Sequence, residues 1–328
     1  MRFLVTGSTG FIGGHLVRYL VSRDHSVTAL VRDLTRAGDL TSSRVNLIEG
    51  DLVLGADLAD SLDQVDCVLH LAGATMSGAE QGYFRVNATG TRKLCEALAR
   101  VRRPPRLVFC SSLAAAGPSV PGRPRKEDQP VAPVSAYGES KLAAEHAVRG
   151  FADRVSAVAV RPPIVYGPGD PAFVPTLRTM VRCGVVPKRG FGTRAYSVIH
   201  VDDLCAALLA AAESDVRLHP EDQVAGVYTV SDGFEYRLED LAAAMAEALG
   251  RRAPAVVPLP GPMIGLAALA AELAGRLLGT APTFNRDKAR ELRCPAWTCS
   301  TENAVRDLGF HPTITLRTGL TRTLESSS

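Results

Sequence analysis

A tyrosine and a lysine four residues apart are the residues of this chain best suited to acid–base chemistry. Tyr137 and Lys141 stand in the segment SAYGESK, which opens a stretch of helical pattern. The spacing of four places both side chains on one face of a helix. A phenol with an ordinary pKa of roughly 10 is a poor base at neutral pH, but a neighbouring ammonium and an oxidised nicotinamide both stabilise the phenolate. The pair could therefore exchange a proton with a hydroxyl or carbonyl while hydride passes to or from a nicotinamide.

A glycine-rich segment near the N-terminus has the pattern of a dinucleotide-binding turn. The sequence TGSTGFIG, residues 6–13, stands between a short apolar strand pattern and a helical pattern, which is the context that this fingerprint requires. Gly7 permits the tight turn, Gly10 lets the backbone approach a pyrophosphate, and Gly13 allows helix and strand to pack closely. The predicted cofactor contacts in this segment are Gly7, Thr9, Gly10, Phe11 and Ile12.

The residue that follows the second predicted strand bears on which dinucleotide is bound. NAD-preferring sites carry an acid there, whereas this chain has Val31 followed by Arg32. An arginine can pair with a 2′-phosphate and stack on adenine. The sequence therefore favours NADP(H) over NAD(H), with Arg36 able to share the role. A solvated arginine at a strand end is the alternative interpretation of Arg32.

Other candidate residues follow the third, fourth and fifth predicted strands. Asp51 could accept hydrogen bonds from an adenine amino group, and a hydroxyl of Ser111 or Ser112 could hydrogen-bond the reacting oxygen. The carboxyl ends of parallel strands share one edge of a sheet, so these residues are expected near the glycine segment. The predicted cofactor contacts after the third and fourth strands are Asp51, Leu52, Leu71, Ala72 and Gly73.

The elements that must position these residues alternate between strand and helix. Apolar, β-branched runs at 2–6, 27–31, 45–48, 67–70, 107–110 and 155–160 are separated by helical patterns. This alternation predicts an α/β fold, a Rossmann-type doubly wound parallel sheet. The pattern changes after about residue 161, where we expect a smaller, mostly helical C-terminal substrate lobe. Its helices are predicted at 174–183, 238–249, 263–278 and 301–308, with a frayed tail after Leu324.

The pattern also predicts the division of the chain into two units. Residues 1–166 and 197–233 are expected to form the NADP-binding domain, and residues 167–196 and 234–328 the substrate-binding lobe. A chain of 328 residues with 46% hydrophobic composition has ample apolar surface for two unequal lobes.

Charge and cysteine usage narrow the class of protein. Lys and Arg total 37 against 34 Asp and Glu, a balance that does not favour nucleic acid as a partner. The densest basic stretch, residues 100–106, is interpreted as a solvated loop. Seven scattered cysteines suit a reducing, cytoplasmic location, and Cys294 and Cys299 lack the second pair or histidines of a zinc site, so no metal is expected. No uncharged run reaches membrane-spanning length without proline, although residues 254–271 could touch a membrane surface.

With these residues in place, the sequence resembles the extended short-chain dehydrogenase/reductase family, the NAD(P)-dependent epimerase/dehydratase group. That group includes sugar-nucleotide epimerases and dehydratases, 3β-hydroxysteroid dehydrogenases and dihydroflavonol reductases. The resemblance covers almost the whole chain and rests on motifs in the family's order: TGSTGFIG, HLAGAT, VNATGT, CSSLAAAG, AYGESK, RPPIVYGPGD and VIHVDDL.

The resemblance implies roles for individual residues. Ser112 would be the catalytic hydroxyl, with Ser111 as the second choice, Tyr137 the acid and base, and Lys141 the ribose anchor. Asn87 would lie near the cofactor or else satisfy helix backbone. His200 and Asp202 would be structural, holding the two lobes together. Contacts implied elsewhere are Pro162 with the cofactor and Thr75, Ser112 and Ile164 with the substrate.

Departures from the family pattern bear on the substrate. Sugar-nucleotide members have an asparagine where this chain has Ile164, and many have Val-Tyr where this chain has Ala115 and Ala116. An apolar side chain at position 164 would leave a pyrophosphate without a hydrogen-bond donor. The apolar segment 258–280 resembles the C-terminal region of the steroid dehydrogenase branch and would suit a hydrophobic pocket, or else be an ordinary packed helix.

Together these features predict an NADP(H)-dependent oxidoreductase that interconverts a secondary alcohol and a ketone. Its substrate is expected to be a mid-sized apolar molecule such as a sterol, terpenoid, polyketide or flavonoid-like compound. The alternatives are a sugar-nucleotide epimerase or dehydratase with bound NAD and a non-catalytic dinucleotide-binding sensor. By resemblance, helices near residues 80–100 and 135–149 would form a four-helix homodimer interface.

Overall fold

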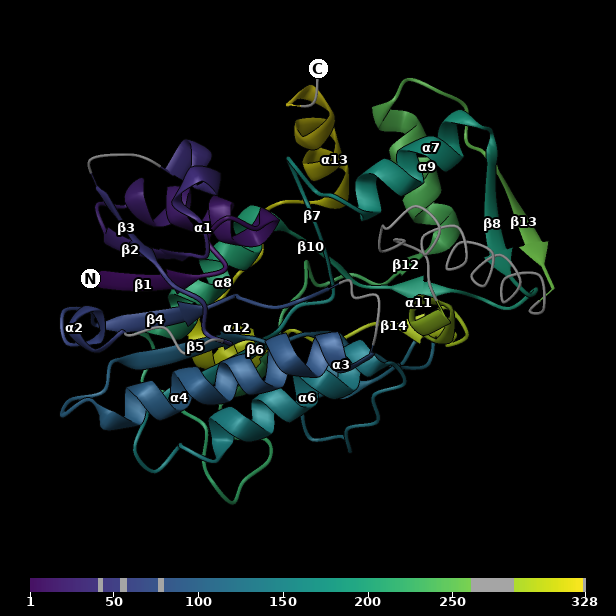
Figure 1. The fold of residues 1–328 in the computed structure, drawn as a ribbon. Helices are drawn as coiled ribbons and strands as arrows, with labels where there is room; N and C mark the ends of the chain where they lie inside the picture. The colour runs from purple at the N-terminus through teal and green to yellow at the C-terminus, as the bar shows by residue number, and fades with distance from the viewer. Residues whose placement is uncertain (41–43, 54–57, 76–79, 261–285, 327–328) are drawn as a thin grey trace.

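The fold is that of a computed structural model, which describes residues 1–40, 44–53, 58–75, 80–260 and 286–326. In this part of the chain the main sheet has seven strands in the order β11-β6-β5-β4-β1-β2-β3 (Figure 1). Their bounds are β1 Arg2–Thr6, β2 Ser26–Val31, β3 Val45–Glu49, β4 Cys67–His70, β5 Arg106–Cys110, β6 Ala157–Arg161 and β11 Val227–Thr229. Every neighbouring pair of these strands is parallel.

The strands are buried because helices cover both faces of the sheet (Figure 1). On one face α1 (Phe11–Val21), α8 (Val201–Glu213) and α12 (Glu302–Leu308) pack on the sheet through a shared apolar cluster. On the other face α2 (Ala59–Leu62), α4 (Gly90–Arg100) and α6 (Ala136–Arg149) do the same. The predicted Rossmann-type doubly wound sheet is confirmed, and its order reverses between β1 and β4, where such sheets bind ligands.

A second group of elements has its own apolar cluster, which includes Tyr166, Leu177, Met245 and Leu320. Its helices are α7 (Phe173–Arg182), α9 (Leu238–Ala248) and α13 (Leu316–Glu325). Short strands join them, which the sequence patterns did not predict. They pair as β7 (Ile164–Tyr166) with β10 (Val198–His200), β8 (Val185–Arg189) with β13 (Ala255–Leu259), and β9 (Ala195–Tyr196) with both β12 (Tyr236–Arg237) and β14 (Ala296–Trp297).

Three expectations of detail need correction or lie beyond the structure. The predicted helices did not include α13, whose first turn is capped by the Thr315 side chain and whose Leu316 and Leu320 are buried; the frayed tail was expected only after Leu324, about where this helix ends. The loop expected at 100–106 ends in β5, where the Arg106 guanidinium donates to Ala211 O at 3.1 Å instead of facing solvent. The helix predicted at 263–278, and with it most of segment 258–280, lies outside the described residues.

The residues His200 and Asp202 make contacts that join elements, and their role in holding the two lobes together stays a prediction. His200 is buried at the start of α8, where its Nδ1 accepts a hydrogen bond from Asp202 N. The Asp202 carboxylate lies 3.5 Å from Nδ1 of His15 on α1. Asp203 accepts hydrogen bonds from the backbone of Thr313 and Ile314, just before α13. The start of α8 therefore connects α1 with the chain that leads to α13.

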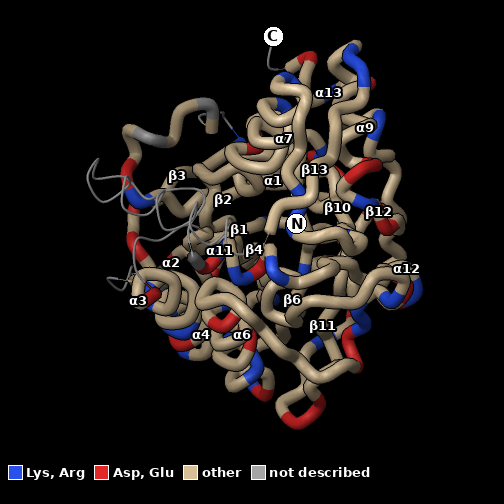
Figure 2. The backbone as a smooth tube through the Cα atoms, turned by 90° about the vertical axis from the view of Figure 1, so that its right-hand side faces the viewer, with Lys and Arg blue, Asp and Glu red and all other residues tan. Residues whose placement is uncertain are grey.

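Along the backbone tube in Figure 2, positions of Lys and Arg alternate with positions of Asp and Glu, in line with the totals of 37 and 34. Within the described ranges no helix is both long enough and apolar enough to cross a bilayer.

A buried carboxyl between β11 and β12 makes stability depend on pH. Burial raises the pKa of Asp232 to about 6, although the hydrogen bond from Tyr236 lowers it. Because the folded pKa lies above the unfolded one, the stabilising contribution is present at acid pH and is lost as pH rises through about 6. We expect the free energy of unfolding of the wild type relative to Asp232→Asn to fall by about 3 kcal/mol between roughly pH 4 and pH 7. Denaturant titrations across this range measure the difference, and parallel curves for the two proteins would contradict it.

Candidate active site

The glycine segment lies at the point where the strand order reverses. Gly7 has φ +71°, and a Cβ atom there would lie 2.7 Å from Ala72 N at the end of β4. A Cβ atom on Gly13 would lie 2.1 Å from Gly7 O. Both positions therefore require glycine for steric reasons, and the close approach brings the predicted contacts Leu71, Ala72 and Gly73 beside the turn between β1 and α1.

This turn fits a dinucleotide pyrophosphate. Gly10 is the residue before α1, and no side chain caps the helix there. The first N–H groups of a helix have no partners within the helix, so they are free to bind an anion. Thr9, Phe11 and Ile12 belong to the same turn and are partly or fully exposed. A nicotinamide dinucleotide bound at this turn would supply hydride transfer at its nicotinamide ring.

The residues predicted to contact adenosine lie at the carboxyl ends of β2 and β3. Arg32 directly follows β2 and is exposed, and in the described part of the chain it has no ion-pair partner. Asp51 follows β3, and its Oδ1 accepts a hydrogen bond from Val53 N at 2.7 Å. Leu52 is buried beside it. The end of β2 thus presents a free cation, which is the feature that a 2′-phosphate requires.

Tyr137 lies in the first turn of α6, beside the turn that carries Ser112. The Ser112 hydroxyl lies near enough to the Tyr137 phenol to lower the pKa of that phenol, and Ser112 begins α5 (Leu113–Ala116) by accepting from Ala114 N at 3.1 Å. The next residue after Tyr137 must be small, because a Cβ atom on Gly138 would lie 2.5 Å from Ala114 O. The structure therefore brings together the hydroxyl pair that the sequence predicted.

Lys141 lies one turn further along α6 and is buried, with 4% of its surface exposed. Its ammonium donates to Cys110 O at 2.7 Å and lies 4.5 Å from the centre of the Phe109 ring. A Cβ atom placed on Gly73 would be 3.7 Å from Lys141 Nζ. The ammonium thus lies beneath the end of β4, on the expected path of a cofactor ribose.

Burial shifts the pKa of both groups toward their neutral forms. It raises the pKa of the Tyr137 phenol above its ordinary value, while the nearby Ser112 hydroxyl acts in the opposite direction. Burial likewise lowers the pKa of Lys141. The phenol is therefore protonated at neutral pH and can donate a proton to a substrate carbonyl.

The sequence left Ser111 as an alternative to Ser112, and the structure gives Ser111 another partner. Its hydroxyl donates to Glu145 Oε1, and the same carboxylate binds Arg161 through Nε at 2.8 Å and a terminal nitrogen at 2.5 Å. All three residues are buried. Sequence reasoning missed Glu145 and Arg161, although Glu145 stands four residues after Lys141 on the same helix.

Asn87 joins the end of β4 to α6. It lies in a π-helical turn (Phe84–Thr89), and its Oδ1 accepts from Ala74 N at 2.7 Å. Its Nδ2 donates to Ala74 O at 3.1 Å and to Ser140 Oγ at 2.8 Å. The Ser140 hydroxyl in turn donates to Tyr137 O at 2.7 Å. Asn87 therefore fixes the chain after β4, beside the predicted cofactor site, instead of capping its own helix.

A buried histidine completes this region and was missed by the sequence reasoning. Burial first, and the charge of Lys141 second, lower the pKa of His70 to about 3. The Thr91 hydroxyl donates to Asn87 O, so its oxygen accepts from His70 Nε2 at 2.8 Å. His70 Nδ1 then accepts from the Thr6 hydroxyl at 2.6 Å. The neutral ring thus links β1, β4 and α4 without adding charge near Lys141.

The three remaining predicted residues lie in two places, Pro162 and Ile164 on the chain after β6 and Thr75 after β4. Pro162 is buried after β6, and its carbonyl accepts from Leu113 N at 2.8 Å, which holds the Ser112 turn. Ile164 begins β7 and packs against the second apolar cluster. Thr75 is exposed after β4. Pro162 and Ile164 therefore lie on the chain that runs from the reacting residues to the smaller group of elements.

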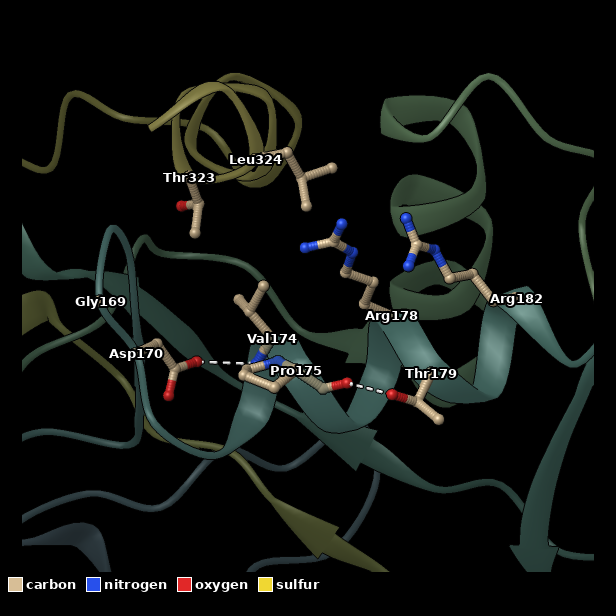
Figure 3. A pocket seen from close by; sticks show the side chains of 9 residues that line it. All are labelled: Gly169, Asp170, Val174, Pro175, Arg178, Thr179, Arg182, Thr323 and Leu324. Carbon is tan, nitrogen blue, oxygen red and sulfur yellow. Dashed lines mark hydrogen bonds between the residues drawn. The ribbon is translucent and has the colours of Figure 1, made fainter. Parts of the chain in front are cut away.

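A cavity of about 340 Å³ lies elsewhere, between α7 and α13 (Figure 3). Arg178 and Arg182 extend from α7 toward α13. Asp170 accepts hydrogen bonds from the first backbone N–H groups of α7. None of the residues predicted to react or to bind a dinucleotide lines this cavity. We do not assign it to the active site.

The fold and this arrangement of residues define the class of protein. The chain belongs to the NAD dependent epimerase/dehydratase family, which it matches over residues 3–226. A structure of MoeE5 in complex with UDP-glucuronic acid and NAD superposes with a TM-score of 0.75 at 27% identity, covering 100% of this chain and 99% of the other. The family is NAD(P)-dependent.

Relatives with named activities include reductases and dehydrogenases. A ceramide reductase of Caulobacter vibrioides is 32% identical over 298 residues, which are 90% of this chain and 85% of the relative. A 2-alkyl-3-oxoalkanoate reductase of Stenotrophomonas maltophilia is 31% identical over 345 residues, with 100% of both chains covered. A decarboxylating sterol-4-alpha-carboxylate 3-dehydrogenase of Schizosaccharomyces pombe is 27% identical, with 98% and 96% covered. The predicted family, its 3β-hydroxysteroid dehydrogenase-like character and the oxidoreductase class are confirmed.

The different partners of the two serines predict opposite phenotypes. Ser111→Ala removes a hydrogen bond from a buried carboxylate, so we expect the free energy of unfolding to fall by about 1–3 kcal/mol. Ser112→Ala removes a hydroxyl that faces Tyr137, so we expect kcat to fall roughly 100-fold with stability changed by about 1 kcal/mol at most. Thermal unfolding and steady-state kinetics of both variants make the comparison. A Ser111→Ala protein that is stable but inactive would reverse the assignment.

Proposed function

We propose that this chain is an NADP(H)-dependent oxidoreductase that interconverts a secondary alcohol and a ketone on a mid-sized apolar molecule. The observation that carries the proposal is the arrangement of the half-buried Ser112 and Tyr137 with the buried Lys141, whose ammonium lies near the end of β4 that borders the turn of Gly7. It combines a proton donor, a hydroxyl and a cation with a site that fits a dinucleotide. The relatives named for ceramide, alkyl-oxoalkanoate and sterol substrates support the apolar class.

Each residue has a distinct task in this reaction. In ketone reduction the Tyr137 phenol donates its proton to the carbonyl oxygen, which Ser112 orients by hydrogen bonding. Lys141 holds the cofactor ribose and, as an ammonium, favours the phenolate that Tyr137 becomes. In the alcohol-oxidising direction the proton returns along the same path.

The preference for NADP(H) is supported by Arg32. Its exposed guanidinium follows β2 and has no ion-pair partner in the described residues. An aspartate or glutamate at this place would repel a 2′-phosphate, whereas an arginine binds it.

A sugar-nucleotide epimerase is the second candidate, since UDP-sugar 4-epimerases share this fold. Ile164 counts against it, because its side chain is apolar and packs on the second apolar cluster, where it offers no hydrogen bond to a pyrophosphate. The reductases and dehydrogenases among the relatives also favour the first candidate.

Two further expectations belong to the proposal. The helices α4 and α6 lie side by side on one face of the sheet (Figure 1), so residues 80–100 and 135–149 could pair with their copies as a four-helix homodimer interface.

All seven cysteines are free and five of them are buried, which suits a reducing cytoplasm.

The acid–base role is tested on a panel of apolar ketones and UDP-glucose with both coenzymes. We expect NADPH-dependent reduction of at least one apolar ketone and a loss of roughly 100- to 10,000-fold in kcat for Tyr137→Phe, because the proton donor is removed. Tyr19→Phe, at a half-buried tyrosine of α1 that packs on the first apolar cluster, is the matched control and should retain its rate. Activity on UDP-glucose alone, with NAD retained through purification, would overturn the proposal in favour of the epimerase.

The coenzyme preference is tested by fluorescence titration. Arg32→Ala removes one charge-assisted contact with the 2′-phosphate, so we expect Kd for NADPH to rise about 10- to 100-fold and Kd for NADH to change less than about threefold. Arg102→Ala, in an exposed loop, serves as the control for loss of charge. Equal changes in Kd for NADPH and NADH would show that Arg32 does not bind the 2′-phosphate.

A further inference from the structure

The N-terminus of α6 is held by a helix from the far end of the chain. In α11 (Arg286–Glu291), Asp287 Oδ1 accepts from Ala136 N at 2.7 Å and Oδ2 accepts from Tyr137 N at 3.2 Å. These N–H groups belong to the first turn of α6, where the helix itself supplies no acceptor. The backbone of Tyr137 is therefore fixed by a carboxylate about 150 positions later in the sequence.

A second carboxylate of α11 completes this contact. Glu291 Oε1 accepts from the Ser135 hydroxyl at 2.9 Å, and Ser135 Oγ accepts from Gly138 N at 3.0 Å. Glu291 is itself oriented by Lys288, at 2.7 Å, and its carbonyl accepts from Trp297 Nε1 at 3.0 Å. Together the two carboxylates engage, directly or through Ser135, the backbone N–H groups on both sides of Tyr137.

We propose that Asp287 and Glu291 are positioning residues of the catalytic site, which fix the first turn of α6 so that the Tyr137 hydroxyl meets Ser112. Their exposed side-chain fractions are 13% and 12%, so the contacts are shielded from water. Negative charge at a helix N-terminus is also favourable. The kinetic part of this inference rests on the proposed function, whereas the structural part does not.

The charge of Glu291 has a consequence for proton transfer. Burial is the largest cause that raises the pKa of Tyr137. Cys110, Glu291 and Tyr83 raise it further, and the ring of Tyr83 lies 6.0 Å from that of Tyr137. Charged groups on the elements packed around Tyr137 include Glu139, Lys141 and Glu145 on α6, Asp287, Lys288, Arg290 and Glu291 on α11, and Glu80 at the start of α3 (Glu80–Tyr83), which pairs with Arg290. Glu291 thus helps to keep the phenol protonated, the form that gives a proton to a ketone.

Amide hydrogen exchange tests the positioning without any substrate. Asp287→Asn keeps the shape of the side chain but loses the charge and one acceptor, so we expect the amides of the 134–141 segment to exchange about tenfold faster. Asp240→Asn is the matched control, because Asp240 Oδ2 caps α9 in the same way by accepting from Arg237 N at 2.8 Å. Unchanged exchange around Tyr137 in Asp287→Asn would overturn the proposal, even if no ketone is ever turned over.

Kinetics then separate positioning from a purely structural cap. For Asp287→Asn we expect kcat for ketone reduction to fall about tenfold, while KM for NADPH stays within about twofold. Asp287→Glu should restore part of the lost kcat. Asp240→Asn should leave kcat unchanged. For Glu291→Gln, the pH at which reduction falls and alcohol oxidation rises should move to lower values, since a negative charge near the phenol is gone. Loss of stability with normal kcat and an unmoved pH profile would leave both residues as ordinary caps and refute the inference.

Discussion

The buried ammonium of Lys141 sets the conditions that the rest of the site must meet. Burying a charge is unfavourable unless it is hydrogen-bonded. The Lys141 ammonium is stabilised by a hydrogen bond to Cys110 O and by its position over the face of the Phe109 ring. Both partners belong to the end of β5, so α6 must lie directly on that strand. The neutral state of His70, enforced by its burial, keeps a second positive charge away from this place.

The same constraint ties the cofactor side of the site to the reacting side. Asn87 holds the backbone of Ala74 after β4 and also the hydroxyl of Ser140, which donates to Tyr137 O. Movement at the end of β4 is therefore transmitted to the first turn of α6. Hydrogen bonds in such a shielded network strengthen one another, so the loss of one member weakens several contacts. The dinucleotide turn and the proton donor form one connected unit.

Local sequence features predicted the sheet and the position of Tyr137 and Lys141 on one helix, because both follow from periodicity. The near-continuous apolar runs predicted six of the seven main strands, and the turn of Gly7 stands where its steric requirement with Ala72 demands glycine. The short strand β11 was not predicted, since three residues carry too little pattern. Contacts between distant segments were also beyond sequence reasoning: Asp287 reaches Tyr137 N only because the chain folds back over α6. Ser111 is adjacent to Ser112 in sequence, and only the position of Glu145 distinguishes them.

The proposed reacting residues and the residue that departs from the sugar-nucleotide pattern belong to different parts of this fold. Ser112 follows β5, and Tyr137 and Lys141 lie on α6, in a fold that this chain shares with MoeE5. Ile164 lies where the chain leaves that sheet, and it packs on the apolar cluster of the smaller group of elements. On the proposed function, isoleucine in place of asparagine here would alter what the site accepts and leave Tyr137 in place. Fold similarity alone therefore does not identify the substrate.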